Sequence, residues 1–242
     1  MKLINIPNII TSLNLVSGCL AIYFGLNGNI DLACVYIILG SIFDFFDGMT
    51  ARALGISGSI GKELDSLADV VSFGIAPSVL CYSLVMQTAP LFCEDAEFIA
   101  LFAFIMAAFS ALRLAKFNCD ERQTTSFIGL PTPANALFWI GLSSLAQIPS
   151  VASFMAQSPE LSAYCVLILM LVFSFLLICE IPMFSFKFKK GHTGFNENIV
   201  RYSFVIISIL CFPLFAYFGK ILASFTAIIL LYIIISIVTS KK

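Results

Sequence analysis

The chain has 242 residues, of which 60% are hydrophobic and 11% charged, and its formal net charge is -1 at pH 7. A globular domain carries about 25% charged residues, so this composition excludes an ordinary water-soluble fold. The near-zero charge gives no support to nucleic-acid binding. Repeated apolar runs of about 20 residues instead predict an all-α, polytopic membrane protein whose partners include membrane lipids.

Turn residues and charges divide the chain into eight expected membrane-spanning helices. They cover residues 8–26, 32–53, 62–86, 98–117, 133–148, 161–184, 199–218 and 221–239. The segments between them, including 54–61 and 149–160, are expected to be loops. We expect one integral membrane domain over residues 1–242, with a catalytic core at 8–184 and additional C-terminal helices at 199–239.

The charges of the expected loops separate by sign, which predicts the orientation in the membrane. Lysine and arginine near the ends of spans stay on the cytoplasmic side. With the N-terminus inside, every basic residue except Lys220 falls on the inner side, and the outer loops carry Asp31, Glu94, Asp95, Glu97 and Glu160. The sequence therefore predicts a protein of a prokaryotic inner or plasma membrane with both termini in the cytoplasm.

Four aspartates stand at helical spacing in the second and third expected spans. Asp44 and Asp47 lie three residues apart, and Asp65 and Asp69 lie four apart, so each pair projects from one face of its helix. Carboxylates at membrane depth are costly and mark functional sites. Two helices joined by the short segment 54–61 can oppose all four groups, whose mutual repulsion calls for a hard cation. We expect one or two ions of Mg²⁺ or Mn²⁺ on the cytoplasmic side.

Small residues and one arginine accompany the aspartates. Gly48 and Ala51 allow a flat or phosphorylated group to approach the helix backbone closely, although small residues in membranes also serve close helix packing. Arg52 offers a bidentate fork suited to phosphate, although an arginine at a span end is also a common interfacial anchor. Together with a cation, these residues favour a site for a nucleotide diphosphate.

The complete pattern reads Asp44-x-x-Asp47-Gly48-x-x-Ala51-Arg52, then eight residues, then Gly61-x-x-x-Asp65-x-x-x-Asp69. It resembles the signature of the CDP-alcohol phosphatidyltransferases at every fixed position. The resemblance implies an all-α fold with a polar cavity facing the cytoplasm and a homodimeric assembly. It also implies transfer of the phosphatidyl group from a liponucleotide such as CDP-diacylglycerol to an alcohol, with release of CMP.

The resemblance also implies roles for individual residues. The metal ligands would be Asp44, Asp47, Asp65 and Asp69, and Asp69 would also act as the general base. The CDP-diacylglycerol site would comprise Gly48, Ala51, Arg52, Gly61, Asn8, Thr11 and Asn14. The three polar residues of the first span recur at helical spacing and would face the donor pocket; interhelical hydrogen bonds are the alternative for them.

Three further stretches resemble the phosphatidylserine synthase branch of that family: 65–77, 113–118 and 129–135. They imply L-serine as the acceptor. A zwitterionic acceptor needs a cation for its carboxylate and neutral polar groups for its ammonium. The expected serine-binding residues are Arg113, Lys116, Asn118, Thr125 and Ser126, and a positive-inside cluster beside a loop is the alternative reading of the basic ones.

Other functions stay open from the residues alone. Glycerol 3-phosphate or inositol phosphate could replace serine as the acceptor, and an archaeal lipid could replace the diacylglycerol donor. A divalent-cation transporter also buries carboxylates in a membrane. A transporter, however, does not require Gly48, Ala51, Arg52 and Gly61 at these intervals.

Overall fold

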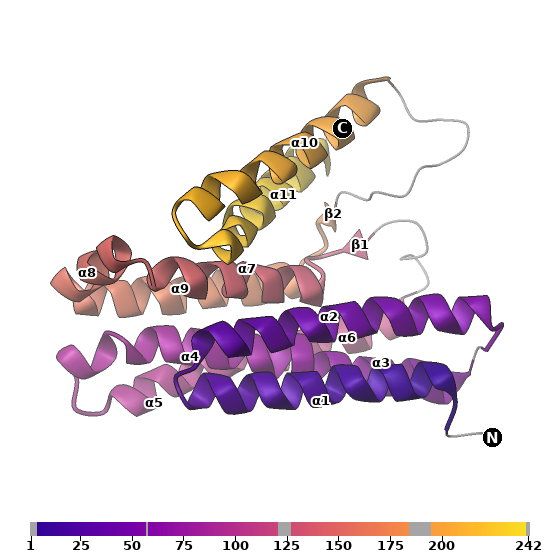
Figure 1. Cartoon of the computed structure of the whole chain (residues 1–242), viewed down its shortest axis with the longest axis horizontal. Helices are drawn as coiled ribbons and strands as arrows, with labels where there is room; N and C mark the ends of the chain where they lie inside the picture. The colour runs from indigo at the N-terminus through magenta and orange to yellow at the C-terminus, as the bar shows by residue number, and fades with distance from the viewer. Residues whose placement is uncertain (1–3, 57, 121–126, 184–194, 241–242) are drawn as a thin grey trace.

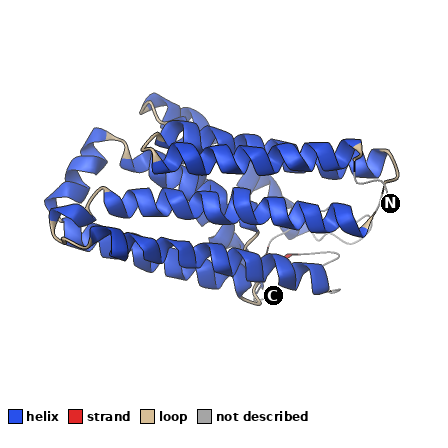
Figure 2. Ribbon diagram, turned by 90° about the horizontal axis from the view of Figure 1, so that it is seen from below, coloured by secondary structure: helices blue, strands red, loops and turns tan. Residues whose placement is uncertain are grey.

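The computed structural model describes residues 4–56, 58–120, 127–183 and 195–240, and most of them lie in helices (Figures 1 and 2). The helices are α1 (Ile6–Leu26), α2 (Ile30–Ala53), α3 (Ser59–Asp69), α4 (Ala76–Met86), α5 (Ala96–Leu101), α6 (Ile105–Cys119), α7 (Thr132–Ala146), α8 (Pro149–Gln157), α9 (Pro159–Ile178), α10 (Phe195–Tyr217) and α11 (Ser224–Ser240). A π-helical turn, Val70–Ile75, joins α3 to α4. The expected all-α fold is confirmed.

The long helices run side by side in a bundle whose C-terminal pair leans away (Figure 1). The helices α1 to α6 make up the lower part in that view, and α7 and α9 lie over them. The helix α1 packs along α2 and α3, and α6 packs against α9. The pair α10 and α11 joins the bundle chiefly through the contact of α11 with α7. The first six helices therefore form the body that carries the aspartates.

Most of the expected membrane spans are present as long apolar helices. Among the described residues, six helices are long and apolar enough to cross a membrane, and the bent pair α7 and α8 makes a seventh if it counts as one span. The helix α7 has 15 residues, and at about 1.5 Å per residue it is shorter by itself than a bilayer core of about 30 Å. The helix α10 has 23 residues, of which Tyr202–Tyr217 form an apolar segment. The expected polytopic membrane bundle is confirmed.

Two helix boundaries near prolines differ from the prediction. The expected loop 149–160 contains α8, which begins at Pro149 and turns 86° from α7. Proline suits the first turn of a helix because the amide hydrogen it lacks is not needed there. The expected span 161–184 ends early, at Ile178, and Pro182–Met183 forms a short strand, β2, that pairs antiparallel with β1 (Phe127–Ile128).

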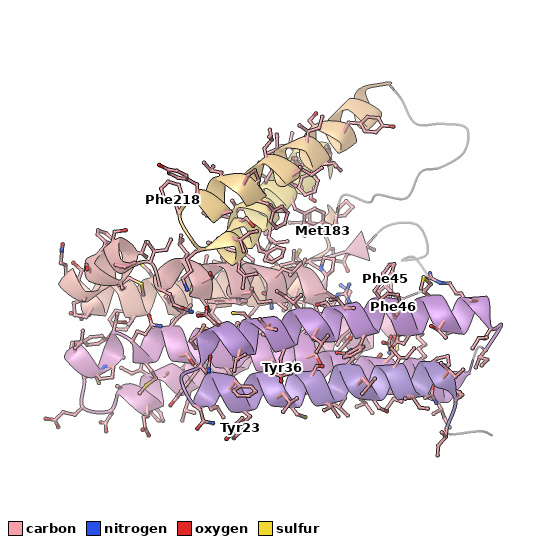
Figure 3. All side chains as sticks on the ribbon, viewed as in Figure 1. Tyr23, Tyr36, Phe45, Phe46, Met183 and Phe218 are labelled. Carbon is pink, nitrogen blue, oxygen red and sulfur yellow. The ribbon has the colours of Figure 1, made fainter. Side chains whose placement is uncertain are left out.

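Aromatic side chains fill the interior between α7 and α9. Trp139, Phe138 and Phe173 are almost completely buried. The Phe138 and Phe173 rings stack with centroids 3.8 Å apart, and Trp139 meets Phe138 edge-on at 5.5 Å. Other large apolar side chains, such as Tyr23 and Phe218, lie exposed on the outside (Figure 3). Apolar side chains both in the interior and on the outer surface are expected of a helix bundle surrounded by lipid.

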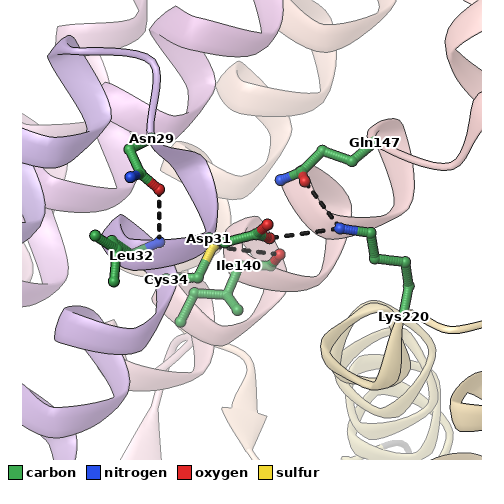
Figure 4. A network of polar contacts seen from close by, with 7 residues as sticks. All are labelled: Asn29, Asp31, Leu32, Cys34, Ile140, Gln147 and Lys220. Carbon is green, nitrogen blue, oxygen red and sulfur yellow. Dashed lines mark hydrogen bonds and ion pairs between the residues drawn. The ribbon is translucent and has the colours of Figure 1, made fainter.

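A polar network ties the C-terminal pair to the rest of the bundle (Figure 4). Lys220, in the turn between α10 and α11, lies 3.5 Å from the Asp31 carboxylate and donates a 2.9 Å hydrogen bond to Gln147 Oε1. Asp31 is in the first turn of α2, and Gln147 caps α7. Lys220 is the basic residue that the predicted orientation leaves on the outer side. Its charge is therefore matched by an acidic partner at the same end of the bundle.

Gly141 generates a test of how α11 is attached. A Cβ atom at Gly141 would lie 2.4 Å from the backbone nitrogen of Thr226, so only glycine allows this approach of α7 and α11. We expect Gly141→Leu to destabilise the protein by about 1–3 kcal/mol, because overpacking forces the backbones apart. Thermal unfolding in detergent measures the change. Cys165→Leu, at an exposed position on α9, is the control, and equal melting temperatures for the two variants would contradict the assignment.

Candidate active site

A glycine turn brings the two aspartate pairs together. Gly55 follows the end of α2 with φ +64, a left-handed conformation that glycine adopts without steric cost. The Ile56 amide donates to the Ala51 carbonyl at 3.0 Å, and the Gly55 amide donates to the Arg52 carbonyl at 3.3 Å. This pair of bonds is the Schellman pattern, which closes a helix end. The chain then reverses, and α3 begins at Ser59 beside α1 and the end of α2.

Three carboxylates converge at this hairpin. One oxygen each from Asp44, Asp47 and Asp65 lies within 4.8 Å of the other two. Asp47 is 6% exposed. Phe45 and Phe46 occupy the positions between the two aspartates of α2 and lie on its exposed side, so the helical spacing separates polar from apolar residues (Figure 3). The expected grouping of Asp44, Asp47 and Asp65 is therefore present.

The donor set of this cluster suits a hard divalent cation. The oxygens Asp47 Oδ2 and Asp65 Oδ1 are buried, and within the described part of the chain neither has a hydrogen-bond partner. Buried polar atoms without partners are rare in native structures and often mark the place of an ion. Carboxylate oxygens are the ligands that magnesium, calcium and manganese prefer. The three side chains could therefore hold a metal ion.

Asp69 lies one turn beyond Asp65 but outside the three-carboxylate group. Its side chain is nearly buried, and its Oδ1 atom accepts a 3.2 Å hydrogen bond from Asn14 Nδ2. Asn14 belongs to α1, so the contact joins segments 55 residues apart. The structure thus gives Asp69 surroundings of its own beside the cluster. Its predicted share in metal binding and its predicted role as base stay predictions.

A cavity of about 1010 Å³ opens beside the cluster. The predicted donor residues that line it are Asn8, Thr11, Gly48, Ala51, Arg52 and Gly61. Asp47 and Asp65 also reach its wall, so the cavity and the carboxylate cluster are continuous. Asn14 is not among the lining residues. Six of the seven predicted donor residues therefore line the same cavity.

Gly48 faces this space and not another helix. No atom lies within 4 Å of a Cβ built on Gly48, so helix packing does not require glycine there. A Cβ on Gly61 would approach Asn8 Oδ1 to 3.4 Å, which is ordinary contact. Of the two readings that the sequence left open for Gly48, the geometry favours an open pocket wall.

Sequence reasoning missed part of the cavity lining. The additional residues are Asn5, Pro7, Gly55, Ile56, Gly58, Ser59, Ile60 and Lys62. Most of them belong to the segment between the two aspartate pairs or to the start of α3. The shortness of that segment, with eight residues between Arg52 and Gly61, was the available signal, because a loop that brings two acid pairs together also borders the space between them.

Comparison with known proteins decides the family. The model of the CDP-alcohol phosphatidyltransferase family matches residues 4–183, which include both aspartate pairs and the cavity. The chain belongs to this family. Its C-terminal helices α10 and α11 lie beyond the matched residues.

Several relatives in the family carry names that specify an acceptor. The chain is 42% identical over 139 residues to the CDP-diacylglycerol--serine O-phosphatidyltransferase of Bacillus subtilis, covering 57% of this chain and 75% of that protein. It is 34% identical over 195 residues to the enzyme of the same name from Mycobacterium leprae, covering 78% and 59%. It is 36% identical over 138 residues to the archaetidylserine synthase of Methanothermobacter thermautotrophicus, covering 55% of each. The similarity thus spans about half to three quarters of these relatives.

The residues expected to bind the acceptor of this phosphatidyltransferase lie on α6 and beside it. Arg113 is 6% exposed, lies near enough to Asp69 for their charges to attract, and has its guanidinium carbon 5.0 Å from the centre of the Phe117 ring. Its position near Asp69 agrees with an acceptor site on that side of the cluster. Thr125 and Ser126 lie outside the described residues.

The other two expected acceptor residues have protein partners in the structure. Lys116 Nζ lies 3.3 Å from the Glu180 carboxylate. Asn118 Nδ2 donates a 2.7 Å hydrogen bond to Ser66 Oγ, and its carbonyl accepts one from Lys62 Nζ. These bonds fasten the end of α6 to α3 and to the segment after α9. The structure therefore gives both residues a positioning contact that sequence did not reveal.

The carboxylate cluster predicts a measurable metal effect. We expect Mg²⁺ or Mn²⁺ to raise the melting temperature of the detergent-solubilised protein, with about 2.7 kcal/mol of stabilisation at a metal concentration 100 times Kd. Asp65→Asn should remove most of this stabilisation, because it deletes one of three convergent ligands. Asp31→Asn, at the opposite end of α2, is the control and should keep it. An unchanged response of Asp65→Asn would refute the cluster as the metal site.

Proposed function

We propose that this membrane protein transfers the phosphatidyl group of CDP-diacylglycerol to the hydroxyl of L-serine, giving phosphatidylserine and CMP. The observation that carries the proposal is the continuity of a three-carboxylate cluster with a cavity lined by Gly48, Ala51 and Arg52. The family match supports the donor chemistry. The names of the relatives support serine as the acceptor.

The cavity is suited to the nucleotide part of the donor. Its volume is at the upper end of the range of about 300–1,000 Å³ that small-molecule sites occupy. The bare backbone at Gly48 would accept the flat cytosine ring, and Arg52 in the cavity lining would pair with the diphosphate. Lys62, also in the lining, adds a second positive charge. We expect the acyl chains of the donor to remain in the surrounding lipid.

In the proposed reaction Asp44, Asp47 and Asp65 would hold one or two Mg²⁺ or Mn²⁺ ions, and the bound metal would supply positive charge for the diphosphate and for the departing CMP. Asp69 accepts the proton of the serine hydroxyl. The serine oxygen forms a bond to the phosphorus that carries the diacylglycerol, and the bond from that phosphorus to the CMP oxygen breaks. An alcohol is a weak nucleophile, so the base and the alignment of the reacting atoms contribute most of the acceleration.

The orientation and assembly extend the same proposal. The chain is an integral membrane protein by the length and apolar character of its helices. We propose that the aspartate end faces the cytoplasm of a prokaryote, where serine enters and CMP leaves, with both termini on that side. The pairing of Lys220 with Asp31 supports the orientation, because it neutralises the basic residue left on the outer side. We also expect a homodimer, as the family resemblance implies.

The assignment is tested with purified protein, CDP-diacylglycerol and radiolabelled serine, with and without Mg²⁺ or Mn²⁺. We expect metal-dependent formation of phosphatidylserine and stoichiometric CMP. Consumption of glycerol 3-phosphate or inositol phosphate in place of serine would overturn the acceptor and keep the family chemistry. Cation flux into liposomes without any lipid product would favour a transporter instead.

Asp69→Asn tests the base. We expect turnover to fall by about 10²- to 10⁴-fold, because a neutral amide cannot take the hydroxyl proton. Binding of CDP-diacylglycerol, measured by its protection against thermal unfolding, should persist, since Asp69 does not line the donor cavity. An Asp69→Asn variant that turns over at the parent rate would refute the role.

Arg113 generates a separate test of the acceptor side. We expect Arg113→Gln to raise the KM for serine about 10- to 100-fold, because a charge-assisted bond to the serine carboxylate is lost. Arg113→Lys keeps the charge as a check on folding. The matched control is Cys119→Ser, at an exposed position on the same helix. Equal effects of Arg113→Gln and Cys119→Ser on the KM for serine would contradict an acceptor role for Arg113.

A further inference from the structure

We infer that Asn14 is a positioning residue that fixes the Asp69 carboxylate for proton transfer, and not a residue of the donor pocket. The inference rests on the proposed role of Asp69. Asn14 is 0% exposed in the middle of α1, and its Nδ2 atom donates to Asp69 Oδ1 at 3.2 Å. Asn8 and Thr11, about two turns and one turn earlier on the same helix, line the donor cavity, whereas Asn14 does not.

The orientation of the Asn14 amide is determined by its partner. An ionised carboxylate only accepts hydrogen bonds, so the amide nitrogen must point toward Asp69. The reverse orientation would place the amide oxygen of Asn14 against a carboxylate oxygen. The bond therefore has one productive geometry, and it occupies Oδ1 of Asp69. The other carboxylate oxygen is left to receive the hydroxyl proton.

A second contact holds the backbone of Asn14 on the same segment. Ser72 Oγ donates a 2.9 Å hydrogen bond to the Asn14 carbonyl oxygen. Ser72 belongs to the π-helical turn Val70–Ile75, which begins directly after Asp69. Single π-helical turns occur often at functional sites. Asn14 is thus bound to Asp69 through its side chain and to Ser72 through its backbone.

Two glycines allow this approach of three segments. A Cβ on Gly18 would lie 2.5 Å from Ser72 Oγ, so a side chain there would displace the serine hydroxyl. A Cβ on Gly40, in α2, would lie 3.0 Å from Asn14 Oδ1. Because both positions lack a side chain, α1, α2 and the π-helical turn enclose the Asn14 amide tightly. The amide has little freedom to turn away from Asp69.

This enclosure has a consequence for the chemistry. Asp69 is one turn from Asp65 on the same helix, and the metal cluster is an attractive alternative partner for a free carboxylate. The Asn14 amide holds Asp69 by a neutral donor on the side of α1. Without it, the carboxylate could rotate out of the line of the serine hydroxyl. A misplacement of about 1 Å at a reacting group can cost about 100-fold in rate.

A purely structural role makes a different prediction. Polar side chains in membrane proteins also bond neighbouring helices together, typically for about 0.6 kcal/mol. The chain offers a matched example, because Ser83 Oγ in α4 donates a 3.2 Å bond to the Gly25 carbonyl of α1. Both bonds join α1 to the continuous run formed by α3, the π-helical turn and α4. The Ser83 bond lies at the C-terminal end of α1, and the Asn14 bond lies in its middle. If Asn14 only bonds helices together, its removal and the removal of Ser83 should act alike.

The experiment compares kcat and KM for both substrates in Asn14→Ala, the near-isosteric Asn14→Leu, Ser83→Ala and Asn8→Ala. We expect both Asn14 variants to lower kcat about 100-fold, with the KM for serine and for CDP-diacylglycerol within about threefold of the parent. Ser83→Ala should change the melting temperature only, and Asn8→Ala should chiefly raise the KM for the donor. Asn14→Leu keeps packing volume, so that folded protein is obtained if Asn14→Ala unfolds.

Two outcomes would overturn the inference. If the Asn14 variants match Ser83→Ala in kcat, the bond only holds helices together. If they raise the donor KM at constant kcat, as expected for Asn8→Ala, Asn14 belongs to the donor pocket. The activity of the unmutated protein distinguishes these outcomes from a failure of the proposed function, because that protein must itself convert serine. If the unmutated protein uses an alcohol other than serine, kcat and KM of the variants are compared with that alcohol.

Discussion

The gathering of four carboxylates among apolar helices, two of them buried and two half-buried, is the constraint on which the rest of this structure depends. Like charges in a poorly solvated setting repel and are costly, so the fold must supply compensating groups around each of them. The glycine turn after α2 places three of them where a cation can be shared, and Asn14 supplies a donor to the fourth. The same turn forms a wall of the cavity, so one local feature assembles both the charged cluster and the space beside it.

Polar contacts between helices fasten both ends of the bundle. At the aspartate end, side-chain hydrogen bonds such as Asn118 to Ser66 and the ion pair of Lys116 with Glu180 fasten α6 to its neighbours. At the other end, Lys220 links the C-terminal pair to α2 and α7. The interior between α7 and α9 is apolar, with Trp139 and Phe173 buried there. The C-terminal pair lies beyond the residues that match the family, yet Gly141 allows α11 to approach α7 at backbone distance.

The errors of the sequence reading have local physical causes. Pro149 was taken as the end of a helix, although a proline in the first turn of a new helix costs nothing. The span 161–184 was extended through Pro182 because the apolar run continues, whereas the backbone becomes extended from Cys179 and pairs as β2 with β1. A two-residue strand pair has no periodicity to detect, and its partners are far apart in the chain. Hydropathy likewise could not separate the short α7 from a full span.

Composition and spacing alone determined the membrane setting and the all-α fold, because apolar length and helical periodicity are properties of the local chain. The resemblance of the motif from Asp44 to Asp69 pointed to the family, and the family match confirmed it. They also determined that Asp44, Asp47 and Asp65 share one site, since their helices are joined by a short turn. Only the tertiary structure decided which neighbour each polar group meets. It turned Asn14 toward Asp69, left Gly48 facing open space, and gave Lys116 a partner in Glu180. The two contacts join residues tens of positions apart in the chain. Like the open space at Gly48, they depend on how whole helices pack.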